Sequence, residues 1–263
     1  MEITNKYALI TGASMGFGKL LAFELCRRQI NVILVSLPGE NIAEVAKACK
    51  EKGVDAQIYE ANLTQREDLL KMTAWANENF DINILINNAG AGGTQSFHES
   101  DLHYIENLMQ INVTAISIIT HQLLPNLLKQ EESFILNVSS MAAISPIGYK
   151  TVYSATKRYI QHFSLALYHE LKGTSVSVSV VLPGPMKTNS EITERILKQG
   201  ILGKIGLVCP QRAARVSIRR LFRKKPFILI GRQNYINRVL LLLMPPRLRM
   251  RLMTRAAHRE LEP

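Results

Sequence analysis

The chain has 263 residues, 47% of them hydrophobic, which suits a single large α/β domain. Its three cysteines are widely spaced and odd in number, which argues against a disulfide framework or a cysteine-bound metal and favours a reducing compartment. The net charge of +11 comes from the C-terminal part, because residues 195–263 carry 17 Lys and Arg against 2 Asp and Glu. Residues 1–194 carry 15 against 19, so the asymmetry predicts a partner or surface for the basic part.

The N-terminal segment predicts a strand, a glycine-rich turn and a helix. It has no cationic lead and no long apolar run, so we expect no signal peptide and a cytoplasmic protein. A short apolar run, residues 7–10, stops at TGASMGFG (residues 11–18), and a helical pattern follows. The glycines allow a tight turn and the close approach of a pyrophosphate, while the helix start supplies free N–H groups. The predicted cofactor contacts in this turn are Gly12, Ser14, Gly16, Phe17 and Gly18.

The second predicted strand, residues 32–35, ends where a dinucleotide-binding protein recognises the adenosine ribose. An acidic residue there would bind the 2′-hydroxyl and repel a 2′-phosphate, but residues 36–39 read SLPG, without an acid, an arginine or a lysine. The hydroxyl of Ser36 can donate to a phosphate oxygen, so the sequence favours NADP(H) over NAD(H). Asn62 and Leu63 follow the third strand and are predicted to lie beside the adenine.

Polar residues also follow the fourth predicted strand, residues 82–86. We predict that Asn88, Ala89 and Gly90 of the sequence NNAG contact a cofactor ribose, although the same sequence also fits an ordinary turn.

The long helices predicted over residues 101–128 contain Asn112 among apolar neighbours. Asn112 is either a structural amide with its partners satisfied or a link, through water, to a lysine further along the chain.

A serine, a tyrosine and a lysine follow the fifth strand, residues 133–138. Tyr153 and Lys157 are four residues apart on a predicted helix and therefore share one face. A nearby ammonium lowers the pKa of a phenol from its usual value of about 10. Ser140 precedes Tyr153 by thirteen residues, so both hydroxyls can converge on one carbonyl oxygen. The same tyrosine–lysine spacing also occurs by chance on solvated helix faces.

The alternation of strands and helices predicts a parallel sheet of about seven strands with helices on both faces. The sixth strand, residues 176–182, ends in PGPMKT (residues 183–188), and the seventh covers residues 227–230. Ligands of such sheets bind beyond the carboxyl ends of the strands. The glycine-rich turn, NNAG, Ser140 and PGPMKT all fall at such ends.

In this order and spacing, the motifs resemble the classical short-chain dehydrogenases/reductases over residues 5–190, and more loosely to residue 231. The resemblance implies one Rossmann-type doubly wound catalytic domain, residues 1–231, and an NAD(P)-dependent oxidoreductase acting on a carbonyl or secondary alcohol. A ketone, a 3-oxoacyl compound and a steroid-like compound remain open as substrates. A non-catalytic nucleotide-binding sensor or scaffold is the alternative, which the intact serine, tyrosine and lysine disfavour.

The resemblance also assigns roles to residues. It implies a catalytic tetrad of Asn112, Ser140, Tyr153 and Lys157, and its spacing selects Ser140 over Ser139. Tyr153 is the expected acid and base, and Lys157 also binds the nicotinamide ribose. The nicotinamide amide is expected to contact Pro183, Gly184, Met186 and Thr188. No metal is expected. Two departures from the family pattern are Asn62, where an aspartate is usual, and Leu37, where NADP-preferring members often have an arginine.

Residues 189–209 lie where this family has its substrate lid. Their apolar residues are Ile192, Ile196, Leu197, Ile201, Leu202, Ile205 and Leu207. They indicate a hydrophobic substrate, or a lid that packs on its own core.

By resemblance, the helices over residues 101–128 and 151–172 pair across a twofold axis, in a homodimer or homotetramer.

Residues 232–263 form a predicted basic helical extension. The apolar run of residues 239–244 is too short to span a bilayer, and Pro246 can start a helix. In that helix arginines recur every four residues, next to an apolar stripe of Leu248, Leu252 and Ala256. This pattern fits peripheral contact with an anionic membrane, or a packing or oligomer contact. Nucleic acid is disfavoured because no aromatic residues alternate with the basic ones.

Overall fold

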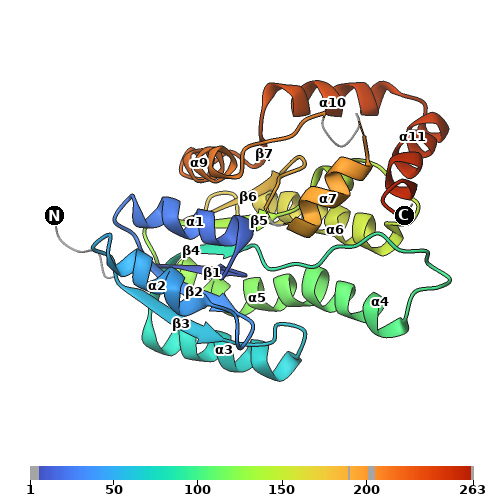
Figure 1. Cartoon of the computed structure of the whole chain (residues 1–263). Helices are drawn as coiled ribbons and strands as arrows, with labels where there is room; N and C mark the ends of the chain where they lie inside the picture. Colours follow the sequence, from blue (N-terminus) through green and yellow to red (C-terminus); the bar gives the residue numbers. More distant parts are fainter. Residues whose placement is uncertain (1–5, 189, 201–204, 262–263) are drawn as a thin grey trace.

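The central element of the fold is a parallel sheet whose strands lie in the order β3-β2-β1-β4-β5-β6-β7 (Figure 1). The computed structural model describes residues 6–188, 190–200 and 205–261. Within them every pair of neighbouring strands is parallel, so the predicted seven-stranded sheet is confirmed. The strands are β1 (Lys6–Thr11), β2 (Asn31–Ser36), β3 (Ala56–Glu60), β4 (Asp81–Asn87), β5 (Ser133–Val138), β6 (Val176–Leu182) and β7 (Phe227–Leu229).

Helices cover both faces of this sheet (Figure 1). One hydrophobic cluster joins α1, α2 and α9 to the strands, and a second joins α3, α5 and α6 to the opposite face. The helices are α1 (Gly16–Cys26), α2 (Ile42–Lys50), α3 (Arg66–Asn79), α4 (Leu102–Met109), η1 (Gln110–Thr114), α5 (Ala115–Leu128), η2 (Met141–Ile144), α6 (Thr151–Glu170), α7 (Ser190–Lys198), α9 (Pro210–Leu221), α10 (Arg232–Leu243) and α11 (Pro246–His258).

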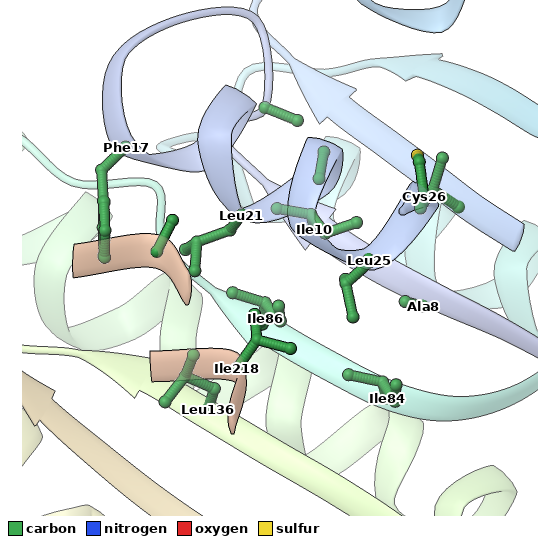
Figure 2. Packing of buried hydrophobic residues seen from close by; sticks show 14 of the residues in the cluster. Ala8, Ile10, Phe17, Leu21, Leu25, Cys26, Ile84, Ile86, Leu136 and Ile218 are labelled. Atoms are coloured by element: carbon green, nitrogen blue, oxygen red, sulfur yellow. The ribbon is translucent and has the colours of Figure 1, made fainter. Parts of the chain in front are cut away.

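The central strands are buried on both faces, and their sequences are therefore almost continuously apolar. All six residues of β2 are buried, as are all seven of β6. Figure 2 shows the packing on the α1 side, where Leu21 and Leu25 of α1 and Ile218 of α9 meet Ile86 of β4 and Leu136 of β5. This packing fixes the height of α1 above the sheet, and with it the position of the glycine-rich turn that precedes the helix.

The strand order reverses between β1 and β4, because the chain runs outward from β1 to β3 and then returns to pair β4 with the other side of β1. In doubly wound sheets the crevice beyond the carboxyl ends of the two strands at such a point binds the ligand. The glycine-rich turn after β1 and the NNAG sequence after β4 therefore share the ligand crevice.

The stretch Leu102–Leu128 is long and apolar enough to cross a membrane by length and composition, and it is the single stretch of this kind among the described residues. It consists of α4, η1 and α5, and α5 buries Ile119, Leu123 and Leu127 in the core. Asn112 lies within it and is also buried. We interpret the stretch as a core helix pair that packs on the sheet.

The basic extension forms two helices, α10 and α11, and α11 begins at Pro246 as predicted. Asn234 of α10 is buried and its Nδ2 donates to the carbonyl oxygens of Ile230 at 2.8 Å and Gly206 at 3.0 Å. In α11, the hydroxyl of Thr254 accepts from the backbone N–H of Gly148 at 2.9 Å. These contacts tie the extension to the lid and to the loop before α6, while the boundary at residue 231 stays a prediction.

Candidate active site

The ends of β1 and β4 are held together by Asn88. Its Nδ2 donates to the carbonyl oxygens of Thr11 and Gly12, both at 3.0 Å. The backbone N–H groups of Asn88 and Ala89 both donate to the Thr11 hydroxyl at 3.0 Å. A Cβ at Gly18 would lie 2.0 Å from the Gly12 carbonyl oxygen. Only glycine fits at position 18, because the turn and α1 approach so closely.

The N-terminus of α1 is open toward this turn. Met15 at the N-cap position makes no side-chain capping bond, and the first turn of the helix has no acidic residue. Gly16 has a φ of 55°, in the left-handed region that glycine tolerates. Free N–H groups and the positive end of the helix dipole therefore face the crevice, and this cradle fits the pyrophosphate of a dinucleotide. The side chain of Phe17 packs into the core (Figure 2), so only its backbone faces the turn.

Carboxylates border the predicted adenosine end of the crevice. Ser36 is buried, and its hydroxyl donates to the carbonyl of the following residue at 3.1 Å. Glu40, just beyond the SLPG sequence, accepts a hydrogen bond from the Ser14 hydroxyl. Glu60, at the end of β3, accepts from the backbone N–H of Gly39 at 3.1 Å. Residues 36–39 contain no acidic residue, but Glu40, the next residue, places a carboxylate beside Ser14.

The side chain of Asn62 closes its own turn. Its Oδ1 accepts from the backbone N–H and the hydroxyl of Thr64, at 3.1 and 2.8 Å. Leu63 is buried in the core beside it. Contact of either residue with an adenine stays a prediction.

Asn112 lies in η1, a π-helical turn of a kind often found at functional sites. Its Oδ1 accepts from the backbone N–H of Ala91 at 3.2 Å, and its Nδ2 donates to the Ala91 carbonyl at 2.9 Å and to the Thr156 hydroxyl at 3.2 Å. A Cβ at Gly90 would lie 2.7 Å from Asn112 Oδ1 and 3.2 Å from Lys157 Nζ. The amide is therefore satisfied by the protein and also lies near Lys157, and the proposed water between them stays a prediction.

The two serines after β5 have different partners. Ser139 is buried, and its hydroxyl donates to the carbonyl oxygen of Lys157 at 2.7 Å. The hydroxyl of Ser140 accepts from the backbone N–H of Ala142 at 3.1 Å, and it lies close enough to the Tyr153 phenol to lower the pKa of that phenol. These contacts support the choice of Ser140 as the serine of the site.

Tyr153 and Lys157 lie one turn apart in α6, with Lys157 Nζ 5.9 Å from the centroid of the Tyr153 ring. The ammonium donates to the carbonyl oxygen of Val138 at 3.3 Å. The loop after β4 packs against the tyrosine ring, because a Cβ at Gly92 would lie 3.0 Å from a ring carbon. The ring is thus held in place while its hydroxyl faces Ser140.

Burial raises the pKa of Tyr153 above its ordinary value, although the nearby Ser140 hydroxyl acts in the opposite direction. Burial also lowers the pKa of Lys157 to about 8. The net shift of the Tyr153 pKa is therefore upward, opposite to the lowering that we predicted from Lys157, because burial is the larger effect. Stabilisation of the charged form of Tyr153 by Lys157 stays a prediction. At neutral pH Tyr153 is therefore a phenol with a proton to donate, and Lys157 carries its charge.

The turn after β6 closes the crevice from the other side. A Cβ at Gly16 would lie 3.7 Å from the Cβ of Thr188, so the turn faces the glycine-rich turn. Lys187 and Thr188 line a cleft of about 420 Å³ together with Thr193 and Leu197 of α7. Met186 packs on the core. Thr188 therefore faces the glycine-rich turn, and its contact with a nicotinamide amide stays a prediction.

The predicted lid is α7 and the segment that follows it. Its apolar residues divide between two environments: Ile196 is buried, whereas Leu197, Ile205 and Leu207 are exposed. Ile201 and Leu202 lie outside the described residues. The division supports both earlier interpretations of the lid, a packed underside and an apolar surface available to a substrate.

Three residues of the crevice and lid were missed by the sequence analysis: Glu40, Asn234 and Glu260. Asn234 anchors the lid, since its Nδ2 donates to the carbonyl oxygen of Gly206 at 3.0 Å. Glu260 is buried beside Arg195 of the lid and Lys150, which precedes α6. A signal for Glu260 was present in the sequence, because it is one of only two acidic residues in the basic segment 195–263.

The strand ends of β1, β4, β5 and β6 thus bring a dinucleotide cradle to the same edge as a serine, a tyrosine and a lysine. This combination defines a nicotinamide-dependent oxidoreductase site on a doubly wound sheet. The family model of the short chain dehydrogenases matches residues 6–198, so the chain belongs to this family. The resemblance stated from the sequence is confirmed.

Individual relatives agree with this assignment. Very-long-chain 3-oxoacyl-CoA reductase of Anas platyrhynchos is 32% identical over 182 residues, which cover 67% of this chain and 58% of the relative. 17-beta-hydroxysteroid dehydrogenase type 3 of Mus musculus is 33% identical over 191 residues, which cover 70% of this chain and 61% of the relative. A short-chain dehydrogenase from Sphingobium yanoikuyae, solved in complex with NADPH, has a TM-score of 0.77 at 25% identity and covers 91% of this chain and 96% of its own. The chain spans about three fifths of the length of these two curated relatives.

Proposed function

We propose that this protein is an NAD(P)-dependent oxidoreductase that interconverts a carbonyl group and a secondary alcohol on a hydrophobic substrate. The observation that carries the proposal is the approach of Ser140, Tyr153 and Lys157 at the edge of the sheet that holds the dinucleotide cradle. The names of the relatives, a 3-oxoacyl-CoA reductase and a hydroxysteroid dehydrogenase, support a long or polycyclic apolar substrate. A non-catalytic nucleotide sensor would have no use for these three side chains together.

A bound nicotinamide dinucleotide supplies the hydride in this chemistry. The Ser140 hydroxyl holds the carbonyl oxygen, and Tyr153 donates its phenolic proton to that oxygen in the reductive direction. The raised pKa of Tyr153 keeps the donor protonated at neutral pH. Lys157, charged below a pH of about 8, stabilises the phenolate that forms when the proton leaves. Asn112 holds the loop after β4 in place through Ala91.

The substrate class is tested by kinetics with a panel of carbonyl compounds. We expect oxidation of NADH or NADPH with a bulky ketone, a 3-oxoacyl thioester or a steroid ketone. For acetone we expect kcat/KM to be lower by tenfold or more, since each missing methylene removes about 1–3 kcal/mol of binding in an apolar pocket. Saturable binding of the cofactor without turnover of any of the three classes would favour the nucleotide sensor instead.

We infer that Glu40 influences the choice between NADP(H) and NAD(H). The weak preference for NADP(H) rests on Ser36 and on the absence of an acid in residues 36–39. Against it stands the carboxylate of Glu40, which the Ser14 hydroxyl holds at the predicted adenosine end. A carboxylate about 6 Å from a doubly charged 2′-phosphate destabilises binding by about 1.4 kcal/mol in a water-like dielectric.

The Glu40→Gln substitution is therefore expected to tighten NADPH binding by about tenfold and to change NADH binding little. Fluorescence titration with both cofactors measures the ratio of the two Kd values. Glu44→Gln is the matched control, because Glu44 is an exposed carboxylate in the first turn of α2. An equal effect of the two substitutions on NADPH would show that Glu40 has no specific role.

We also propose that α10 contacts an anionic membrane surface, so that the protein is cytoplasmic and peripheral to a membrane. α10 exposes an apolar row whose most exposed member, Leu243, has 78% of its surface accessible. The apolar row consists of Tyr235, Ile236, Val239, Leu240, Leu242 and Leu243. Exposed arginines border it, at positions 232, 247 and 251. An apolar helix face with a basic border is typical of helices that lie in the membrane interface.

The exposed apolar residues favour α10 over α11 as the helix that makes this proposed membrane contact. Of the apolar stripe predicted in α11, Ala256 is buried against the protein, and only Leu248 is well exposed. α11 is therefore a packing helix with a basic outer side, and its neighbour α10 supplies the apolar surface.

For the oligomer we propose that α5 and α6 form the twofold contact of a homodimer or homotetramer. Tyr159 of α6 hydrogen-bonds Ser117 of α5 at 2.8 Å and stacks on Phe163, and part of its ring is exposed. Met109, which precedes η1, is half exposed. Exposed aromatic and apolar groups on these helices support a contact between copies of the chain.

A further inference from the structure

The carboxylate of Glu260, in the turn after α11, is buried among donor groups. Its side chain is 1% exposed and lies 2.7 Å from Lys150 Nζ and 3.3 Å from Arg195 Nε. The hydroxyl of Thr94 and the amide of Gln199 also donate to it. Burial raises the pKa of Glu260, but Lys150 and the hydrogen bonds outweigh this effect and hold the pKa below its ordinary value. The group is therefore a carboxylate at neutral pH.

The segments that supply these donors also surround Tyr153. Thr94 follows Gly92, whose backbone packs against the tyrosine ring. Lys150 precedes the catalytic helix α6, and it lines a small cavity together with Tyr153. Arg195 belongs to α7 of the lid, and Figure 1 shows α7 and α11 beside α6. The charges of Arg195 and Glu260 are close enough to act on the pKa of Tyr153. The donor group is thus part of the wall around the reacting oxygen.

Lys150 requires an anion at this place. Only 11% of its side chain is exposed, and burial lowers its pKa against the effect of Glu260. Removing one partner of a buried ion pair leaves an uncompensated charge, which is strongly destabilising. An ammonium, a guanidinium, a hydroxyl and an amide N–H are the donors that proteins use to bind carboxylate and phosphate groups. An anion other than Glu260 would satisfy the same donors.

We propose that Thr94, Lys150, Arg195 and Gln199 form an anion-binding subsite of the substrate pocket. Glu260 fills it in the substrate-free state, and a carboxylate or phosphate group of the substrate fills it during turnover. Glu260 can leave without unfolding a helix, because it follows α11 in a turn closed by the bond from its own N–H to the Ala257 carbonyl. The role in turnover rests on the proposed function and narrows the substrate to apolar carbonyl compounds that carry an anionic group.

The subsite itself is tested by chemical rescue of the Glu260→Ala variant, with no need for activity. We expect its Tm to fall by about 6 °C, and sodium acetate to restore most of this loss in a saturable manner. A separate titration with phosphate shows which of the two anions the subsite binds. Acetamide, which has the shape of acetate without its charge, and sodium chloride, which matches the ionic strength, are the controls. If the variant is unfolded without an anion, the same titration is followed as recovery of helical circular dichroism.

Two comparisons complete the rescue experiment. Acetate is expected to leave the wild-type Tm unchanged, because Glu260 already fills the subsite, and to have no effect on the double variant Lys150→Met/Glu260→Ala. A loss of Tm in Glu260→Ala that neither acetate nor phosphate restores would overturn the proposal and leave Glu260 as a structural ion-pair partner alone.

The role in turnover is tested with a hydrophobic keto acid and its methyl ester. We expect the ratio of kcat/KM for the acid to that for the ester to rise about tenfold in Glu260→Ala, and to fall about tenfold in Lys150→Gln. Equal ratios in all three proteins would overturn this part of the proposal. If no ketone is turned over, the proposed oxidoreductase function fails, while the acetate rescue still reports on the subsite.

Discussion

Replacing Tyr153 with Phe is expected to lower kcat for ketone reduction by about three orders of magnitude and to leave cofactor binding unchanged. The substitution removes only the hydroxyl that lies close to Ser140, and the ring still packs against Gly92. Lys157 does not replace the phenol as the proton donor, because its ammonium donates to the Val138 carbonyl. Steady-state kinetics and a fluorescence titration with the preferred cofactor measure the two effects.

Tyr159→Phe is the matched control for this experiment. Tyr159 lies in the same helix, and its hydroxyl bonds Ser117 at 2.8 Å, away from the crevice. We expect its kcat to change by less than about twofold. A Tyr153→Phe variant that retained about a tenth of the wild-type kcat would mean that water or another side chain delivers the proton. A joint loss of activity and cofactor binding would assign the hydroxyl a structural role.

The fold followed from the sequence because its determinants are local. Strands buried on both faces need apolar residues at successive positions, and runs such as residues 32–35 show this directly. A side chain at position 18 would clash with Gly12 and with Asn88, so only glycine fits there. The spacing of the glycines in the motif therefore reflects the close packing of the turn. The strand ends then share one edge of the sheet as a consequence of the parallel order.

The parts of the site that depend on distant contacts did not follow from the sequence. Glu260 and Thr94 are separated by 166 positions, and no periodic pattern connects them. The distance between Tyr153 and Lys157 in sequence predicts a shared helix face but gives no information about burial, which sets the direction of both pKa shifts. The residue spacing in α11 likewise predicts an apolar stripe, but it does not tell whether that stripe faces the protein or the solvent.

The exposed apolar row of α10 leads to the second large expected effect. Replacing both Leu240 and Leu243 with Ser is expected to weaken binding to vesicles containing anionic lipid by about 100-fold. The two side chains are 56% and 78% exposed, so in the protein they contribute little to the core, whereas in a membrane interface they would be removed from water. Burying two leucine side chains to a large extent contributes about 3 kcal/mol, which corresponds to this change in Kd. Vesicle flotation measures the bound fraction.

The controls separate apolar insertion from charge and from unfolding. Leu102→Ser changes an equally exposed leucine, 66% accessible, at the start of α4, and is expected to leave flotation unchanged. Replacing Arg247 and Arg251 with Gln is expected to reduce binding to anionic vesicles at low salt, by about 1 kcal/mol for each arginine. Wild-type protein that does not float with anionic vesicles would rule out the membrane contact. A second copy of this chain would then be the expected partner of the apolar row, because an exposed surface of this kind on a folded protein is normally covered by another molecule.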